Sequence, residues 1–260
     1  ANLERLVIKG SSIRDNECYI DGEWAMGGGA GIYNLDKASI SMSTIAGNGT
    51  QYGWDGIFNG QQAELQIENS TISGNGSTGI DNEGIVGLNF ATLAFQPISI
   101  VSASGNASVQ NSIFADSPCI GNAIHPVGAN IDTDGSCDVS YTVPLEGLFL
   151  SPLGDYGGPT FTHQLQPNSP AIDAATELPG MTDTIKECPP TDQRGEPRGA
   201  GKACDLGAYE FQGDVPAAKS LLGTNPPSIT ADSAANIDSL TATQTLTRTQ
   251  EATLTPTTTL

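Results

Sequence analysis

Positive charge is scarce in this chain. Its 260 residues include 10 Lys and Arg against 29 Asp and Glu, which gives a formal net charge of −19. No Lys or Arg occurs between residues 38 and 185. Nucleic-acid binding requires clustered cations, as does attraction to an anionic membrane surface, so both kinds of partner are disfavoured. A lyase of acidic polysaccharides is disfavoured too, because it needs a basic side chain and cations near the uronate group.

Other features are missing as well. No apolar run reaches the roughly 18 residues that a membrane-spanning helix needs, so we expect no membrane-spanning segment. The presence of only two His and the absence of a Cys-x-x-Cys pair argue against a zinc site. The chain shows neither an initiator Met nor a signal peptide, as we expect of a mature or excised segment.

A repeated spacing is present instead. In Leu65–Asn75 (LQIENSTISGN), Leu, Ile, Ser, Ile and Asn occupy offsets 0, 2, 5, 7 and 10. The same offsets recur from Leu6 and from Ala38, and looser copies begin at Val86 and Ala107. A second series runs in phase with the first, namely GIYN at 31–34, GIFN at 56–59 and GIDN at 79–82.

This spacing predicts an all-β fold, a right-handed parallel β-helix, since repeats of roughly 20 to 30 residues are typical of stacked solenoid coils. Steps of two residues keep side chains on one face of a strand, and the three-residue step between them lets the chain turn a corner. Asn at offset 10 suits a turn and could bond its neighbours as a ladder. We expect the interior to hold Ile8, Ile13, Ile40, Ile45, Ile67 and Ile72. The alternative is an antiparallel sandwich with chance alternation.

Four of the five Cys form two local pairs in the sequence, Cys119 with Cys137 and Cys188 with Cys204. Each pair would close a short loop in a region poor in regular structure, as disulfides do in secreted proteins. Cys18 is left over, either buried or paired with another chain. Five reduced thiols in a cytosolic protein are the alternative, but the Thr-rich end of the chain favours an extracellular protein, secreted or attached to the cell surface.

The chain divides into three parts. We expect residues 1–118 to form the coils, residues 119–213 a C-terminal capping region, and residues 214–260 a Pro- and Thr-rich linker and tail. The last 20 residues carry Thr at 10 positions, which suits a disordered, O-glycosylated stalk. An alternating Thr segment could instead add as a strand to an open sheet edge during self-assembly. This candidate strand contains Thr241, Thr243, Thr245, Thr247 and Thr249.

The capping region resembles a known bacterial family. SPLGDYGGPTFTHQLQPNSPAIDAA at 151–175 and DQRGEPRGAGKACDLGAYEF at 192–211 are similar to the C-terminal signature of choice-of-anchor Q domain proteins, and GANIDTDGSC at 128–137 fits the same pattern. Tyr156 and Ala175 depart from it, where the family usually has Asn and Gly. The resemblance implies a secreted, surface-attached protein with right-handed parallel β-helix repeats. It implies no enzymatic activity.

Cations and carboxylates lie close together within this signature. Guanidinium groups bond carboxylates in a fixed geometry, so we expect a structural ion-pair network that pins an irregular loop. Its expected members are Asp192, Arg194, Arg198, Asp205 and Glu210. We expect the whole region to close the end of the solenoid, since terminal coils need a cap.

Catalytic and metal-binding candidates are few. A glycoside hydrolase needs a pair of carboxylates, and Asp81 with Glu83 could share one face. Asp132 and Asp134, in DTDG, resemble half of a calcium loop but lack its closing Glu, and Ca²⁺ is the one cofactor that the sequence suggests. We expect His163 to be packed and hydrogen-bonded, because no second His or Cys lies near it. Aromatic residues that could bind sugars or cover the core are Trp24, Tyr33, Tyr52, Trp54 and Phe58.

Two functions follow as hypotheses. The first is a non-catalytic extracellular surface protein, structural or adhesive, that binds glycans or assembles with itself head-to-tail into filaments. The second is a polysaccharide-active enzyme of the glycoside hydrolase type, built on a β-helix.

Overall fold

The structure, a computed structural model, describes residues 5–17, 29–49, 55–121, 124–139, 141–175 and 188–213. The chain divides into two compact units, Ala1–Ala218 and Lys219–Leu260, and every described residue belongs to the first. Outside the described residues lie the alternating Thr segment 241–249, Cys18, Trp24, Tyr52 and Trp54. In the described ranges, no helix is long and apolar enough to cross a membrane.

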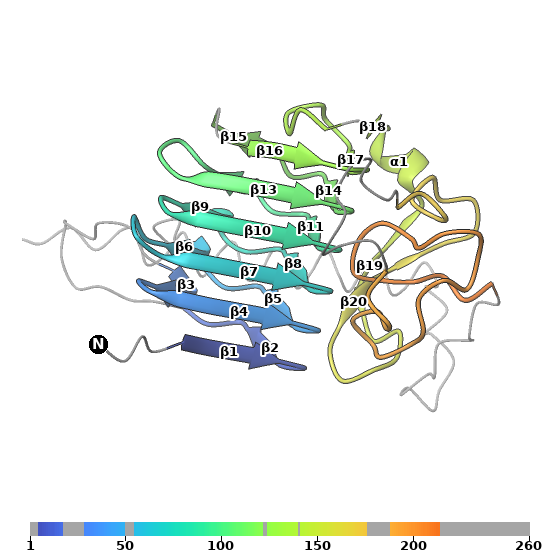
Figure 1. The fold of residues 1–260 in the computed structure, drawn as a ribbon, viewed down its shortest axis with the longest axis horizontal. Coiled ribbons are helices and arrows are strands. Elements are labelled where there is room, and N and C mark those ends of the chain that lie inside the picture. The colour runs from blue at the N-terminus through green and yellow to red at the C-terminus, as the bar shows by residue number, and fades with distance from the viewer. Residues whose placement is uncertain are drawn as a thin grey trace, which may run out of the picture. The chain divides into compact units, whose positions relative to one another are not determined.

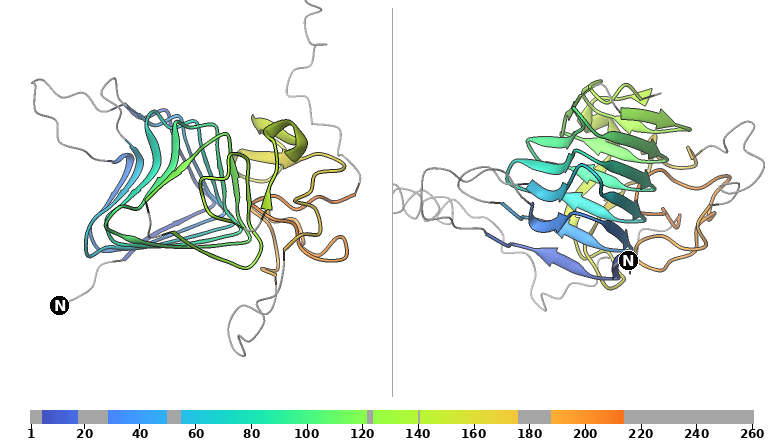
Figure 2. Two further views of the ribbon diagram at one scale, coloured as in Figure 1. Left: turned by 90° about the horizontal axis from the view of Figure 1, so that it is seen from above. Right: turned by 60° about the vertical axis from the view of Figure 1, so that its left-hand side comes forward.

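The described chain winds into a right-handed parallel β-helix, as the repeat predicts (Figures 1 and 2). The first sheet contains β1 (Arg5–Lys9), β4 (Lys37–Ser41), β7 (Glu64–Glu68), β10 (Ile85–Asn89), β13 (Asn106–Gln110) and β16 (Ile124–Val127). The second contains β2 (Ser12–Arg14), β5 (Thr44–Ala46), β8 (Thr71–Ser73), β11 (Thr92–Ala94), β14 (Ile113–Ala115), β17 (Ile131–Asp132) and β18 (Tyr141–Thr142). The third contains β3 (Gly29–Asn34), β6 (Asp55–Asn59), β9 (Thr78–Asn82), β12 (Ile98–Val101) and β15 (Cys119–Ile120).

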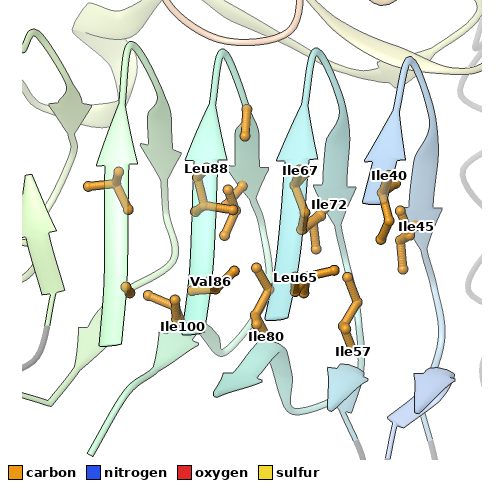
Figure 3. Close-up of a cluster of buried hydrophobic side chains, with 14 of the residues drawn as sticks. Ile40, Ile45, Ile57, Leu65, Ile67, Ile72, Ile80, Val86, Leu88 and Ile100 are labelled. Atoms are coloured by element: carbon orange, nitrogen blue, oxygen red, sulfur yellow. The ribbon is translucent and has the colours of Figure 1, made fainter. Parts of the chain in front are cut away.

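The aliphatic side chains of the repeat stack on one another inside the coils (Figure 3). In the first sheet the register aligns Ile8, Ile40, Ile67, Leu88 and Val109. In the second it aligns Ile13, Ile45, Ile72, Leu93 and Phe114. All are buried except Ile8 and Ile13 of the first coil, which are partly buried. Burial of one such side chain contributes about 1.5–3 kcal/mol, so these columns stabilise the coil stack strongly.

The corner between the first and second sheets is made by one residue in the left-handed region of backbone conformation. In successive coils this residue is Gly10, Met42, Asn69, Phe90 and Asn111, with φ of 56°, 51°, 45°, 50° and 49°. The Ser that follows in the repeat is buried in the corner, where Ser70 Oγ accepts a hydrogen bond from Ser43 N at 3.2 Å and donates to Glu68 O at 2.8 Å. The three-residue step in the sequence is therefore this corner.

Two amide ladders run along the stack at the other corners. Asn16, Asn48 and Asn75 each donate from Nδ2 to the following coil, at 2.8, 3.1 and 3.1 Å, and the ladder ends on Gln96. The second ladder contains Asn34, Asn59, Asn82 and Ser102, at 2.7, 2.8 and 3.0 Å. A Cβ on Gly56 would lie 2.7 Å from Asn75 Cγ, which explains the Gly at the start of GIFN. Asn48 and Asn75 each begin an Asn-x-Ser/Thr glycosylation motif, and their burial leaves no room for a glycan.

The coils extend past residue 118, where we expected them to end. β16 pairs with β13 in the first sheet, and β17 and β18 continue the second sheet to Thr142. The expected boundary is wrong because the later strands are short and lack the repeated Ile and Ser positions, although their backbones pair in the same way.

Residues 133–139, the end loop, close this far end of the core. Cys137 is buried in the core cluster, Val139 packs against it, and the Cys119–Cys137 disulfide ties the loop to β15. The Asp132 carboxylate, itself buried, accepts hydrogen bonds from the backbone N–H groups of Asp134 (2.6 Å), Gly135 (2.7 Å) and Cys137 (2.8 Å). The carboxylate and the disulfide together fix the loop.

Residues 143–175 and 188–213, the flank, pack along the outer face of the second sheet (Figure 1). The flank contains α1 (Leu145–Leu148), the antiparallel pair β19 (Leu150–Gly154) and β20 (Thr162–Leu165), and the Cys188–Cys204 disulfide. Both predicted disulfides are therefore confirmed. The expectation that the whole region 119–213 closes the solenoid end is corrected, because only the end loop does so. The outer face of the second sheet carries small and hydroxyl side chains, on which another layer can pack. The flank lies at the side of the coils because it supplies that layer.

Candidate functional site

Gln193 connects the flank to the coils through buried hydrogen bonds. Its Oε1 accepts a hydrogen bond from Thr71 Oγ1 at 2.7 Å, and its Nε2 lies 2.9 Å from Thr44 Oγ1, Thr160 Oγ1 and Phe161 O. One coil further on, Thr92 Oγ1 accepts from the flank's Ala208 N at 3.0 Å. The outward Thr side chains of three successive coils thus form a row of hydroxyl groups with which the flank makes hydrogen bonds. Gln193 was not among the predicted site residues, and its sign in the sequence was the Thr at the sixth offset of three successive repeats, at positions 44, 71 and 92.

Arg194 and Asp192 form a buried ion pair in which two guanidinium N–H groups share one carboxylate oxygen. Arg194 Nη2 and Nε lie 2.7 and 2.9 Å from Asp192 Oδ2, and the other oxygen accepts the Arg194 backbone N–H at 2.8 Å. The guanidinium carbon also stands 3.6 Å from the centroid of the Tyr209 ring. Such a pair fixes the loop geometry and leaves Asp192 no open lone pair for chemistry.

Arg198 joins the flank to a coil corner. Its Nη1 lies 3.2 Å from Glu210 Oε2, its Nη2 donates to Asn69 Oδ1 at 2.6 Å, and its guanidinium carbon stands 4.2 Å from the Phe90 ring centroid. Burial lowers the pKa of Arg198, and the carboxylates of Glu210, Asp192 and Asp205 counter that effect. Asn69 and Phe90 are left-handed corner residues, so the contact explains why these corners carry larger side chains than Gly.

Asp205 completes the set of five residues singled out in the signature. Its two oxygens accept the backbone N–H groups of Asp173 and Phe211. Burial raises the pKa of Asp205 to about 7, although these two hydrogen bonds lower it. The structure therefore brings Asp192, Arg194, Arg198, Asp205 and Glu210 together in the interior of the flank.

A groove of about 450 Å³ lies where the flank hairpin meets the coil corners. Its lining includes Arg14, Asp15, Phe95 and, at the floor, Ser73 and His163. His163 Nδ1 faces Ser151 O at 2.8 Å and so carries the proton, while Nε2 accepts the Ser73 hydroxyl at 2.9 Å. Burial lowers the pKa of His163 to about 4. His163 is packed and hydrogen-bonded, as the sequence predicts.

A Ser and a His in hydrogen-bond contact raise the question of nucleophilic catalysis. An acyl-transfer site also needs free N–H groups to stabilise the oxyanion. The four corner amides that line the groove are engaged, because the N–H groups of Asp15, Gly47 and Gly74 each donate to a carbonyl of the following coil at 3.1 Å and that of Phe95 does so at 2.9 Å. A base whose pKa is about 4 is also a weak proton acceptor at neutral pH. The Ser73–His163 contact therefore holds the flank to the coils.

The calcium hypothesis at Asp132 and Asp134 does not fit the geometry. Three backbone N–H groups occupy the Asp132 carboxylate, and Asp134 Oδ1 accepts the N–H of Ser136 at 2.9 Å. Across the described ranges, no group of three His, Cys, Asp or Glu is placed to hold a metal ion. The acidic turn in DTDG shapes the end loop instead.

The remaining described candidates, Asp81, Glu83, Tyr33 and Phe58, lie on or beside the third sheet. Tyr33 and Phe58 stack with ring centroids 4.9 Å apart and an interplanar angle of 17°. Asp81 lies in register with Phe58 on the next strand, and its pKa is raised by burial and then by the charge of Glu83. Tyr33 and Phe58 are the described members of the aromatic set that could bind sugars or cover the core.

The N-terminal end of the coil stack differs from the far end. In the described ranges, β1, β2 and β3 each pair on one side only, and we call their free edges the open end (Figure 1). Leu6 is 45% exposed, although Ala38 and Leu65, its counterparts in the next coils, are 3% and 0% exposed. The outward side chains of Val7 and Tyr33 are 62% and 55% exposed. Unpaired edges with exposed apolar side chains are the usual template for association with another strand.

Comparisons with protein-family models, with curated proteins and with solved structures found no match for this chain. The resemblance to choice-of-anchor Q domain proteins therefore stays a prediction from the signature at 151–175 and 192–211.

Proposed function

We propose that the chain is a non-catalytic extracellular protein of the cell surface, in which the β-helix serves as a structural or adhesive rod. The observation that carries this proposal is the buried polar contact between coils and flank. Gln193 and Arg198 hold the flank against the coils through side-chain hydrogen bonds, and Arg194 fixes the flank loop by bonding Asp192. These buried polar side chains thus stabilise the packing of the flank on the coils.

The two disulfides support the extracellular part of the proposal, because such bonds form and persist in oxidising compartments. Surface attachment and kinship with the choice-of-anchor Q family belong to the same proposal, and the C-terminal signature supports them. Extracellular glycans are the proposed ligands in the adhesive form. The scarcity of cations favours neutral glycans over acidic ones.

A glycoside hydrolase is the second candidate, and one observation favours it. The raised pKa of Asp81 is what a general acid requires. Such an enzyme needs two carboxyl groups that face one substrate site. Asp81 does not line the groove described above, and Asp15 is the one carboxylate among the described lining residues. The structural rod is therefore better supported.

Self-assembly is the finer part of the proposal. The alternating Thr segment 241–249 of one copy would add as a strand at the open end of another, held by main-chain hydrogen bonds. A contact between two different surfaces of identical chains is heterologous, so it propagates as a filament unless it closes.

Parallel assays of binding and hydrolysis separate the two candidates. The purified full chain and the Asp81→Asn variant are incubated with neutral polysaccharides, and both retention on the polysaccharide and release of reducing ends are measured. The proposal expects no release by either protein and equal retention. Release by the wild type that Asp81→Asn abolishes would replace the rod with the hydrolase.

A further inference from the structure

The outward residues of the first sheet direct their backbone N–H groups toward the preceding coil, and in later coils these groups find an acceptor there. Glu64 N donates to Asp36 O of the preceding coil at 2.7 Å, and the residues at the same position of the next two coils donate in the same way at 2.9 and 2.7 Å. Arg5 holds this position in the first coil, since it is in register with Lys37 and through it with Glu64. The N–H of Arg5 therefore points out of the open end, as do the N–H groups of Val7 and Lys9, the next two outward residues of β1.

The side-chain ladder has a direction as well. Asn48 Oδ1 accepts from N and Nδ2 of Asn16, at 3.2 and 2.8 Å, and Asn75 Oδ1 accepts from the same two groups of Asn48, both at 3.1 Å. Each Asn donates to the following coil and accepts from the preceding one. Asn16 Oδ1 has no donor among the described residues. In the corner, Ser43 Oγ accepts from Ser11 N at 3.1 Å, and no described N–H reaches Ser11 Oγ.

Apolar side chains at the open end are covered on one side only. Leu6 is 45% exposed, whereas Ala38 and Leu65, which follow it in register, are 3% and 0% exposed. Tyr33 stacks on Phe58 with one face of its ring and is 55% exposed. One more coil below the first would bury these surfaces as the later coils bury theirs.

The charges of the first coil also restrict which coil could stack on it. In mid-stack, Lys37 bonds Glu64 of the following coil at 2.9 Å. Arg5 and Lys9 stand in the two outward columns that hold Glu64 and Glu68 two coils later. A coil with acidic residues at these two positions would therefore meet both cations when placed below β1.

The far end of a second copy does not supply such a coil. The N–H groups that alternate with the outward ones donate toward the following coil, and the corner residue Met42, which comes next in this alternation after β4, does so to Glu68 O at 3.2 Å. Pro126 takes an inward position in the last strand, in register with Val109, and has no N–H to donate. The end loop 133–139 also closes the core on that side.

We infer that the open end is the docking surface for a further parallel β-coil, stacked in register, that carries Asn and Ser at the ladder positions and acidic side chains opposite Arg5 and Lys9. The Thr segment 241–249 contains no Asn, Ser or acidic residue, so its addition as a strand would pair with the backbone of the open end without continuing the Asn and Ser ladders or meeting Arg5 and Lys9 with opposite charge. The inference goes beyond the proposed function, because it specifies the kind of partner and does not require that partner to be a second copy.

The chain itself supplies the probe. Residues 64–84 make one coil with Glu, Ser and Asn at the required positions, and Ile85, which follows them, lies in the column that Arg5 begins. The test variant carries a copy of residues 64–84 directly before Arg5 in place of residues 1–4. Its matched control carries Asn75→Ala in the copied coil only. Thermal unfolding and amide hydrogen exchange of Val7 and Lys9 are measured for both and for the wild type.

We expect the added coil to raise Tm by roughly 3 °C or more, since about 1 kcal/mol shifts a domain of this size by that amount. The amides of Val7 and Lys9 should exchange at least about tenfold more slowly, and the Asn75→Ala control should gain less in both measurements. Unchanged Tm and unprotected amides would overturn the docking surface, and equal gains with and without Asn would overturn the ladder requirement. Neither result depends on self-association, so a failure of the proposed assembly is recognised separately.

Discussion

Thr71 donates a hydrogen bond to Gln193 at 2.7 Å, although 122 residues separate the two in the chain. The outward Thr of the second sheet and the flank therefore stabilise each other. Without the flank, the second sheet would expose hydroxyls and small residues. Without the Thr row, the flank would lose the hydrogen bonds by which Gln193 and Ala208 contact three successive coils.

Gln193→Leu should destabilise the fold. The substitution removes the buried amide from Thr44, Thr71 and Phe161 O; Thr44 and Phe161 O still bond each other, whereas Thr71 Oγ1 loses its acceptor, and such an unsatisfied group costs about 1–3 kcal/mol. We expect a loss of about 1–3 kcal/mol in the free energy of unfolding, measured by urea denaturation. Gln62→Leu, at an exposed turn, is the control and should change stability little. Similar stability of the two variants would show that the contact does not hold the flank.

Ile67→Asp tests the register of the coils. Ile67 is buried between Ile40 and Leu88, so a carboxylate there would be desolvated without a partner and should abolish folding. Gln66→Asp changes the neighbouring outward position of the same strand and should be tolerated. Circular dichroism during thermal unfolding distinguishes them, and a wild-type Tm for Ile67→Asp would mean that the register is wrong.

His163 makes stability depend on pH. Its pKa is about 4 in the folded chain and 6.5 in the unfolded one, so the unfolded state binds the extra proton first. The stabilisation is fully present above pH 6.5 and is lost as pH falls toward 4, by up to about 3 kcal/mol. His163→Gln should lack this loss.

Asp205 acts in the opposite direction over a similar range. Because its folded pKa is raised to about 7, stability decreases as pH rises from the ordinary Asp value toward 7. Comparing wild type with His163→Gln at each pH cancels this contribution. A stability difference between the two proteins that stays constant from pH 7 to 4 would contradict a buried neutral His163.

The Cys119–Cys137 disulfide should matter for the end loop. Removing it as the Cys119→Ser/Cys137→Ser double variant should cost about 3 kcal/mol, because the bond closes a loop of 18 residues. Limited proteolysis should then cut within residues 133–139 first. Mass spectrometry of a non-reduced digest gives the reference, and free thiols at both positions in secreted protein would contradict the pairing.

The interior of the coils could be predicted from the sequence because its signal is local. Ile67 and Ile72 lie within one coil, and period-two spacing is enough to assign their direction. The left-handed corners could not, since Gly, Met, Asn and Phe all occupy that position. Met and Phe rarely adopt this backbone conformation, and tertiary packing imposes it on Met42 and Phe90.

The site was predicted only in part, for a related reason. The carboxylates and guanidinium groups near residue 200 could be grouped from their spacing, as Arg194 with Asp192 shows. Their location at the side of the coils could not be foreseen, because it depends on contacts such as Arg198 with Asn69, which are 129 residues apart. Asp132 was misassigned as a candidate ligand because a carboxylate that accepts three backbone N–H groups has the same sequence pattern as a calcium turn.

End-on association of the full-length chain is the most direct test of the structural role. Light scattering over a range of protein and salt concentrations would be compared for the wild type, Val7→Lys, and a chain without residues 229–260. Ile85→Lys, in a mid-stack position of the same face, is the control for the added charge. We predict association that strengthens with salt, since screening weakens the repulsion from the net charge of −19. Val7→Lys should reduce it and Ile85→Lys should not. A full-length wild type that stays monomeric at every protein and salt concentration would contradict the account.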